Sequence, residues 1–191
     1  MNPYKGGMEL IVLGIDPGSV KTGWPLLKVV GSKISYIDSG VLKFNSKKDF
    51  LARIPQMKQL LSDLLAKTSP DQLALESLIY VKSPTALMKL AQTRGVVIAE
   101  SIEFVGDKIF EYSPNLIKSA ITGHGHANKE SIQKTIKMIL GVDDFATHDE
   151  SDAIAIALCH ILMRGKPNTK HTGGAKGSRS LKASLAHKVN L

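Results

Sequence analysis

The chain has 191 residues, 43% of them hydrophobic and 22% charged, which is the balance of an ordinary globular protein with a buried core. No apolar run approaches the ~18 residues that a membrane span needs, and the N-terminal MNPYKGG contains no secretory signal, so we expect a cytoplasmic protein with no membrane partner. A single cysteine, Cys159, excludes an intrachain disulfide framework and a cysteine-based zinc cluster, while the net charge of +8 favours a polyanionic partner.

Three strands are predicted near the N-terminus. They cover residues 9–16, 22–30 and 33–44. Gly31 and Ser32 form a tight turn between the second and third strands, so the three predict an antiparallel meander. Pro25 removes a hydrogen-bond donor from the second strand and makes its local geometry uncertain.

The first strand ends on a carboxylate. Asp16 follows a run of apolar residues and precedes the turn signal Pro17-Gly18, so its charge lies at the edge of the core. A buried charge needs a partner, and a bound cation is one candidate. The other is an Asp that opens a turn by accepting hydrogen bonds from backbone N–H groups.

The middle of the chain alternates helix and strand. An apolar stripe predicts a helix over residues 47–67, in which Pro55 would introduce a kink. The short strand of residues 72–77 again ends near a carboxylate, Glu76. Ser83 and Pro84 then have the pattern of an N-cap and first residue of a helix that runs to about residue 103.

The C-terminal part repeats this pattern. A strand over residues 108–112 is followed by a second Ser-Pro helix start, and the loop GHGHANK leads to a helix that ends at Gly141. The last helix begins at Thr147, which has capping-box spacing to Glu150. Asp149 and Asp152 lie three residues apart in its first turn and therefore on one face.

The charge distribution divides the chain into two parts. We expect residues 1–164 to form one α/β domain and residues 165–191 to form a disordered tail, which has six Lys and Arg residues and no Asp or Glu. The tail either keeps the protein soluble or holds nucleic-acid phosphates.

Four carboxylates are candidates for a metal-dependent active site. They are Asp16, Glu76, Asp149 and Asp152. If the two acid-bearing strands are neighbours and the last helix packs across them, the acids converge, and their repulsion requires hard cations such as Mg²⁺ or Mn²⁺. Two such ions, spaced ~3.5–4 Å apart, catalyse phosphodiester hydrolysis. For Asp149 alone, a favourable interaction with the helix dipole is the simpler interpretation.

The segments LGIDPGSVKTGW, ALESLIYVKSPTALMKLAQTRG, GHGHANK and HDESDAIAIALCH resemble, in order and spacing, the signature regions of bacterial RuvC-type Holliday junction resolvases. The resemblance implies a ribonuclease-H-like fold with a mixed five-stranded sheet, in which two parallel strands extend the meander and helices flank the sheet. It also implies a homodimer that cuts two opposed strands of four-way junction DNA in recombination and repair. The cleavage is Mg²⁺-dependent, with two ions per site, and Mn²⁺ is expected to substitute.

The resemblance also assigns residues. The metal-binding acids of the family match Asp16, Glu76, Asp149 and Asp152, and its basic residues beside the scissile phosphate match Lys118 and Lys129. A junction-wedging aromatic position of the family is Ile79 here, next to Tyr80, and either side chain could insert between bases or belong to the core.

Other polar residues have weaker assignments. Arg94 either contacts DNA or forms a structural ion pair that orients a carboxylate. His124 and His126 are a weak zinc signal and fit a DNA-contacting loop better, and the role of His148, beside Asp149, is open.

Three other functions compete with junction resolution. An actin-like or sugar-kinase-like ATPase needs two domains, and a noncatalytic junction-binding scaffold would be expected to lack at least one of the acids. A related nuclease that acts on RNA–DNA hybrids is the nearest enzymatic alternative. Whether a branch-migration complex of the RuvA–RuvB type supplies the junction is open.

Overall fold

The computed structural model describes residues 9–78, 83–142 and 148–164, with the backbone alone for His148 and Asp149. The elements follow the predicted order. The strands are β1 (Glu9–Ile15), β2 (Lys21–Val30), β3 (Lys33–Lys43), β4 (Gln72–Glu76) and β5 (Ile109–Tyr112). The helices are α1 (Phe50–Thr68), α2 (Pro84–Val105), α3 (Pro114–Thr122), α4 (Lys129–Leu140) and α5 (His148–Met163).

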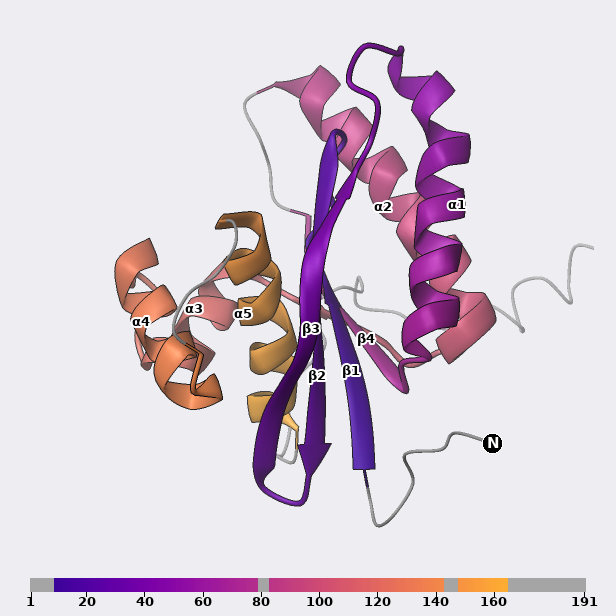
Figure 1. The fold of residues 1–191 in the computed structure, drawn as a ribbon. Coiled ribbons are helices and arrows are strands. Elements are labelled where there is room, and N and C mark those ends of the chain that lie inside the picture. The colour runs from indigo at the N-terminus through magenta and orange to yellow at the C-terminus, as the bar shows by residue number, and fades with distance from the viewer. Residues whose placement is uncertain (1–8, 79–82, 143–147, 165–191) are drawn as a thin grey trace, which may run out of the picture.

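The five strands form one mixed sheet in the order β3-β2-β1-β4-β5 (Figure 1). β1, β2 and β3 pair antiparallel, as the meander predicts, and β4 and β5 add to β1 in parallel. This arrangement confirms the predicted mixed sheet. It also confirms that the two acid-bearing strands, β1 and β4, are neighbours.

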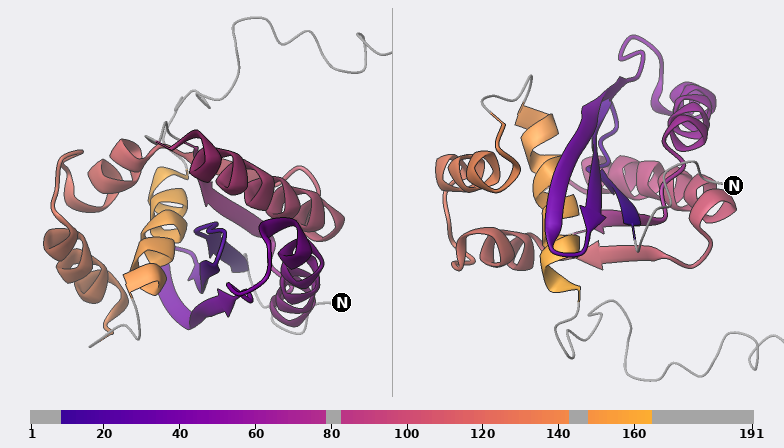
Figure 2. Two further views of the ribbon diagram at one scale, coloured as in Figure 1. Left: turned by 90° about the horizontal axis from the view of Figure 1, so that it is seen from above. Right: turned by 60° about the horizontal axis from the view of Figure 1, so that its bottom comes forward.

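Helices cover both faces of the sheet (Figures 1 and 2). α5 packs on one face, with α3 and α4 on its outer side, and α1 and α2 cover the other face. Side chains alternate along β1, so that Val12 belongs to the core on the α5 side while Leu13 and Ile15 belong to the core under α1 and α2.

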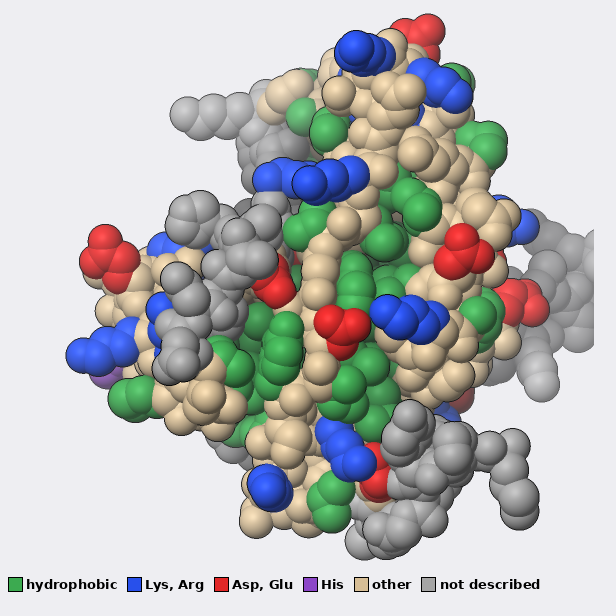
Figure 3. Space-filling model, viewed as in Figure 1, with side chains coloured by type: hydrophobic (Ala, Val, Ile, Leu, Met, Phe, Trp, Pro, Cys, Tyr) green, Lys and Arg blue, Asp and Glu red, His purple; other side chains and the backbone are tan. Residues whose placement is uncertain are grey.

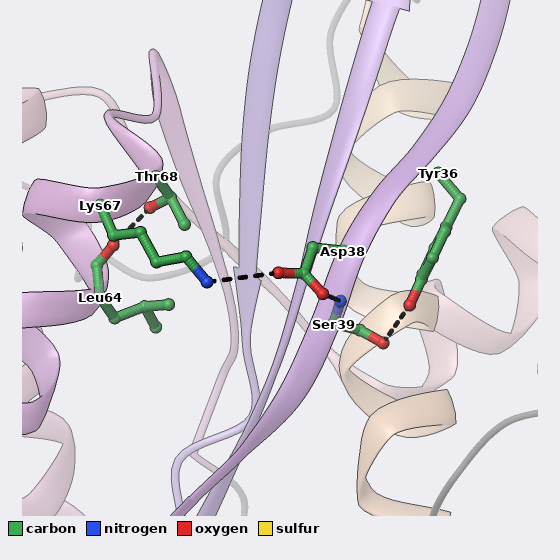
Figure 4. Close-up of polar contacts among 6 residues, drawn as sticks. All are labelled: Tyr36, Asp38, Ser39, Leu64, Lys67 and Thr68. Carbon is green, nitrogen blue, oxygen red and sulfur yellow. Dashed lines mark hydrogen bonds and ion pairs between the residues drawn. The ribbon is translucent and has the colours of Figure 1, made fainter.

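β2 continues through Pro25, and its irregularity is confined to the pairing with β3. The register shifts between Leu26 and Leu27, where Ile37 is an additional residue of β3. Figure 4 shows polar contacts at this bulge, one to α1 and one between two residues of β3. Lys67 Nζ of α1 lies 3.6 Å from Asp38 Oδ2, and Tyr36 Oη lies 2.6 Å from Ser39 Oγ.

The helix starts follow the predicted caps. Ser83 Oγ accepts from the N–H of Ala86, and Ser113 Oγ accepts from the N–H of Leu116, both at 3.3 Å. Gly141 ends α4 in the left-handed conformation, with a φ of 63°. Thr147, the predicted N-cap of the last helix, lies outside the described residues.

Two details of the predicted helices were wrong. α1 begins at Phe50 rather than near residue 47, and Leu51, predicted within its apolar stripe, is 66% exposed. Ile102, an apolar position of the predicted helix that corresponds to α2, is 50% exposed. Among the described residues no helix is both long and apolar enough to span a membrane.

Candidate active site

Two of the predicted acids lie side by side at the end of the sheet. β1 and β4 are parallel, with Ile15 paired to Leu75, so Asp16 and Glu76 follow at equivalent positions. Neighbouring strands are about 4.8 Å apart, and residues at equivalent positions point to the same face. That face is the α5 side, because Val12 and Ala74, which precede these acids on the same faces of their strands, belong to the α5 core.

α5 approaches β1 closely because β1 carries a glycine at the crossing. A Cβ atom at Gly14 would lie 2.8 Å from the carbonyl oxygen of Ala153 and 2.9 Å from Cβ of Ala157. Such contacts are too short for any side chain, so only glycine permits this approach. Ala153 is the neighbour of Asp152, so the contact brings the first turns of α5 to the strand that ends at Asp16.

The pKa of Glu76 responds to charges on other elements of the fold. Burial raises the pKa of Glu76, and the negative charge of Asp152 raises it further, whereas the charges of Lys118 and Arg94 oppose the shift. Carboxylates from β4 and α5 therefore repel each other, with lysine and arginine charges close to them. A cation bound between the carboxylates would relieve this repulsion.

Lys129 contacts one of the acids directly. Its Nζ, at the start of α4, lies 2.9 Å from Asp152 Oδ2, and both side chains are about half exposed. The GHGHANK loop thus ends with a lysine that contacts one of the predicted metal-binding acids. An exposed ion pair of this kind contributes little to stability, so Lys129 is able to exchange Asp152 for another anion.

Arg94 is buried, and its contacts favour the structural alternative over DNA contact. Its guanidinium donates to the backbone carbonyl of Glu76 and forms an ion pair with Glu111 of β5. Arg94 therefore fixes the backbone that carries the Glu76 carboxylate, and we interpret it as a positioning residue.

Several predicted site residues remain untested. The side chain of Asp149, the side chain of His148, and Ile79 and Tyr80 lie outside the described part of the structure. His124 and His126 are exposed on the loop between α3 and α4. Within residues 9–78, 83–142 and 150–164, no three His, Cys, Asp or Glu side chains are close enough together to form a metal site.

The donors that are described suit a hard cation. Asp16, Glu76 and Asp152 provide carboxylate oxygens from three different elements, and such ligands select Mg²⁺ or Mn²⁺ over softer metals. The lysines beside them suit the oxygens of a phosphodiester. The donor types therefore fit a divalent cation beside a phosphate, but as placed in the described residues the three carboxylates are not gathered closely enough to ligate one ion.

Sequence reasoning missed two buried polar contacts of α5. His160 is 1% exposed, with Tyr112 Oη at 2.7 Å from its Nδ1 and Gln72 Oε1 at 2.7 Å from its Nε2. Glu150, expected to cap its own helix, accepts a hydrogen bond from Ser39 of β3. The only sequence signal for either contact was a polar residue within an apolar helix, which does not identify its partner.

Comparison with known proteins gives one consistent family. The family described as "Crossover junction endodeoxyribonuclease RuvC" matches residues 12–160. A protein of that name from Trichlorobacter lovleyi is 40% identical over 150 residues, which cover 78% of this chain and 84% of the relative.

Solved structures agree. The structure of T. thermophilus RuvC in complex with a Holliday junction substrate matches with a TM-score of 0.74 and 28% identity, covering 80% of this chain and 93% of that one. The structure of the yeast mitochondrial Holliday junction resolvase Ydc2 matches with a TM-score of 0.58, covering 79% of this chain and 78% of that one. At 19% identity, this match supports the fold alone. These neighbours confirm the predicted ribonuclease-H-like fold.

Proposed function

Because the chain belongs to the RuvC family of crossover junction endodeoxyribonucleases, we propose that it resolves four-way DNA junctions by metal-dependent hydrolysis of two opposed strands. The observation that carries this proposal is the placement of Asp16 and Glu76 at equivalent ends of adjacent parallel strands, with Asp152 close to Glu76. The single thiol, which is buried, agrees with a reducing cytoplasm as the site of the reaction.

The carboxylates hold the metal in this proposal. Asp16, Glu76 and Asp152, together with Asp149 of the same helix, would bind two Mg²⁺ ions. Bound there, the metal supplies Lewis-acid stabilisation of the phosphate and a water molecule of lowered pKa. Uncatalysed hydrolysis of a phosphodiester is so slow that the site must lower the barrier by more than ~15 kcal/mol, mostly through electrostatics.

Lys118 and Lys129 would bind the phosphate that is cut. The charge of Lys118 opposes the rise in the pKa of Glu76, and Lys129 contacts Asp152, so each lysine lies near one of the predicted metal-binding acids. When the DNA and metal bind, Lys129 exchanges Asp152 for a phosphate oxygen. The two lysines thus offset the negative charge that the phosphate brings to the acids.

An exposed face of α2 supports a homodimer. Met88 and Ile102 are 64% and 50% exposed, and three of the exposed residues between them, Ala91, Gly95 and Ala99, are small. No neighbouring atom lies within 4 Å of a Cβ built on Gly95, at the centre of this face. The face is therefore open for close packing against the α2 of a second copy, which would place two active sites on one junction.

The proposal is tested with a synthetic four-way junction beside a linear duplex built from the same arms. We expect paired nicks on opposed strands of the junction only, in Mg²⁺ and not in EDTA. Asp16→Asn should bind the junction and fail to cut it, because it loses a metal ligand without losing a DNA contact. Asp107→Asn is the matched control and should cut normally, because Asp107 is an exposed acid that is not one of the four predicted metal ligands.

Normal cleavage by Asp16→Asn would overturn the metal assignment. Tight junction binding without cleavage by the unaltered protein would favour a noncatalytic scaffold. Cleavage of an RNA–DNA hybrid in preference to the junction would favour the related nuclease.

A further inference from the structure

Two lysines face each other at the end of the sheet that carries the acids. Lys21, the first residue of β2, is paired with Lys43, the last residue of β3. Both side chains are exposed. Residues directly opposite each other on antiparallel strands have Cβ atoms about 4.5–5.5 Å apart, so two lysine charges are held close to one point at this end of the sheet.

The pair points to the same face as Asp16. Asp16 is bridged to Gly23 of β2, and Lys21 lies two residues from Gly23, which is about 7 Å along the strand with the side chain on the same face. The alternation along β2 supports this placement. Leu27, an even number of residues from Lys21, belongs to the core on the α5 side, whereas Leu26 belongs to the core under α1 and α2. On β3, Ser39 contacts Glu150 of α5, and Lys43 lies four residues farther along, again on that face.

A hollow of about 240 Å³ lies beside the β1–β2 turn and the start of β2. Its lining includes Asp16, Gly18, Ser19, Lys21 and Gly23, so it extends from the carboxylate to the first lysine. In Figure 3, Lys and Arg side chains gather at this upper end of the molecule, over the β1–β2 turn and the β3–α1 connection. The hollow is thus open to a ligand that lies across the turn.

The backbone around the lysines is held by one arginine. Arg53 of α1 donates to the carbonyl oxygens of Ser19 at 3.0 Å, Ser46 at 3.1 Å and Lys48 at 2.9 Å. The N–H of Phe44 also donates to the carbonyl of Val20, at 2.8 Å. The segment before Lys21 and the segment after Lys43 are therefore tied together, so the two lysines are positioned before any ligand binds.

We propose that Lys21 and Lys43 bind a phosphodiester of the DNA that flanks the scissile phosphate. The phosphate would lie between the two ammonium groups and direct the strand across Asp16 toward the cut. This site rests on the proposed function and adds to it a contact that fixes the register of the strand over the metal-binding acids.

The test compares Lys21→Gln and Lys43→Gln with Lys33→Gln, an exposed lysine at the opposite end of β3. For each protein, junction binding is measured from 50 to 200 mM salt, and kcat and KM are measured with the same junction in Mg²⁺. We expect each variant of the pair to weaken binding about 3- to 10-fold and to flatten the slope of log K against log salt by about 0.9, the loss of one phosphate contact. KM should rise more than kcat falls, because the contact acts mainly on binding of the strand, and the melting temperature should stay close to that of the unaltered protein because both side chains are exposed.

Binding and salt slope indistinguishable from those of Lys33→Gln would overturn the inference. A fall in kcat at unchanged KM would also overturn it, since the lysines would then act on the acids and not on the strand. The unaltered protein in the same assay tests the proposed function separately, because failure to cut the junction would refute that function whatever the lysines do.

Discussion

At the scale of single residues, the contrast between His160 and Lys129 separates stability from function. Lys129 is half exposed and pairs with Asp152, a proposed metal ligand. His160 is buried, and its hydrogen-bond partners come from distant strands of the fold. In a neutral imidazole one nitrogen donates and the other accepts, which matches a bond from Nε2–H to Gln72 and one from the Tyr112 hydroxyl to Nδ1. His160 therefore belongs to the core as a neutral, hydrogen-bonded group.

The neutral state of His160 predicts that the folded protein loses stability in acid. Burial, followed by the charge of Arg164, lowers the pKa of His160 from 6.5 to about 4. Between these two pKa values the unfolded chain binds a proton at His160 and the folded protein does not. The contribution of His160 to the free energy of unfolding is therefore complete above pH 6.5 and decreases as the pH falls toward 4. The loss is on the order of 3 kcal/mol.

Urea unfolding at a series of pH values measures this effect. The free energy of unfolding should fall more steeply from pH 6.5 to 4 for the unaltered protein than for His160→Gln, which cannot gain a proton. His124→Gln, an exposed histidine, should follow the unaltered protein. Equal slopes for the unaltered protein and His160→Gln would show that His160 is not held neutral.

At the scale of elements, the site depends on the distance between α5 and β1. Gly14 sets that distance, since the carbonyl of Ala153 and Cβ of Ala157 occupy the space of a side chain. We predict that Gly14→Ala moves α5 outward, destabilises the fold by about 1–3 kcal/mol and lowers cleavage, because Asp152 moves away from the strand-end acids. Unfolding measurements and junction cleavage test the two effects.

The matched control is Gly125→Ala. Its new Cβ would meet its nearest neighbour, the carbonyl of Asn115, at 3.5 Å, which is an ordinary contact. This variant should retain the stability of the unaltered protein, and stability is the quantity compared because Gly125 lies in the loop predicted to contact DNA. If Gly14→Ala behaved in the same way, the close crossing would not be what positions Asp152.

The elements also show what the sequence could predict. Strand and helix order, the Ser83 and Ser113 caps and the Gly141 end follow from local chemistry and were correct. The neighbouring positions of Asp16 and Glu76 required the sheet order, which the sequence offered only as a condition. The Arg94 contact with the Glu76 carbonyl and the partners of His160 depend on distant segments, so no local pattern could have specified them.

At the scale of the whole molecule, the exposure of Ile102 is informative. An apolar stripe predicts a buried face, and here part of that stripe faces away from the core of the single chain. The exposed positions Met88, Gly95 and Ile102 recur every seven residues, which is the spacing of a helix that packs along a second helix. In the proposed dimer, a second copy of α2 would bury this part of the stripe.

The last prediction follows from this face. In a twofold-symmetric dimer, Ile102→Glu places two new charges in the interface, so we expect sedimentation equilibrium to report a monomer. The variant should retain its fold, and it should lose paired cleavage of the junction, because a monomer presents one active site instead of two. Met138→Glu, at a position of α4 that is 72% exposed, is the control and should remain dimeric. A dimeric Ile102→Glu would place the interface elsewhere, whereas a monomer that still makes paired cuts would mean that the two strands are cut without a stable dimer.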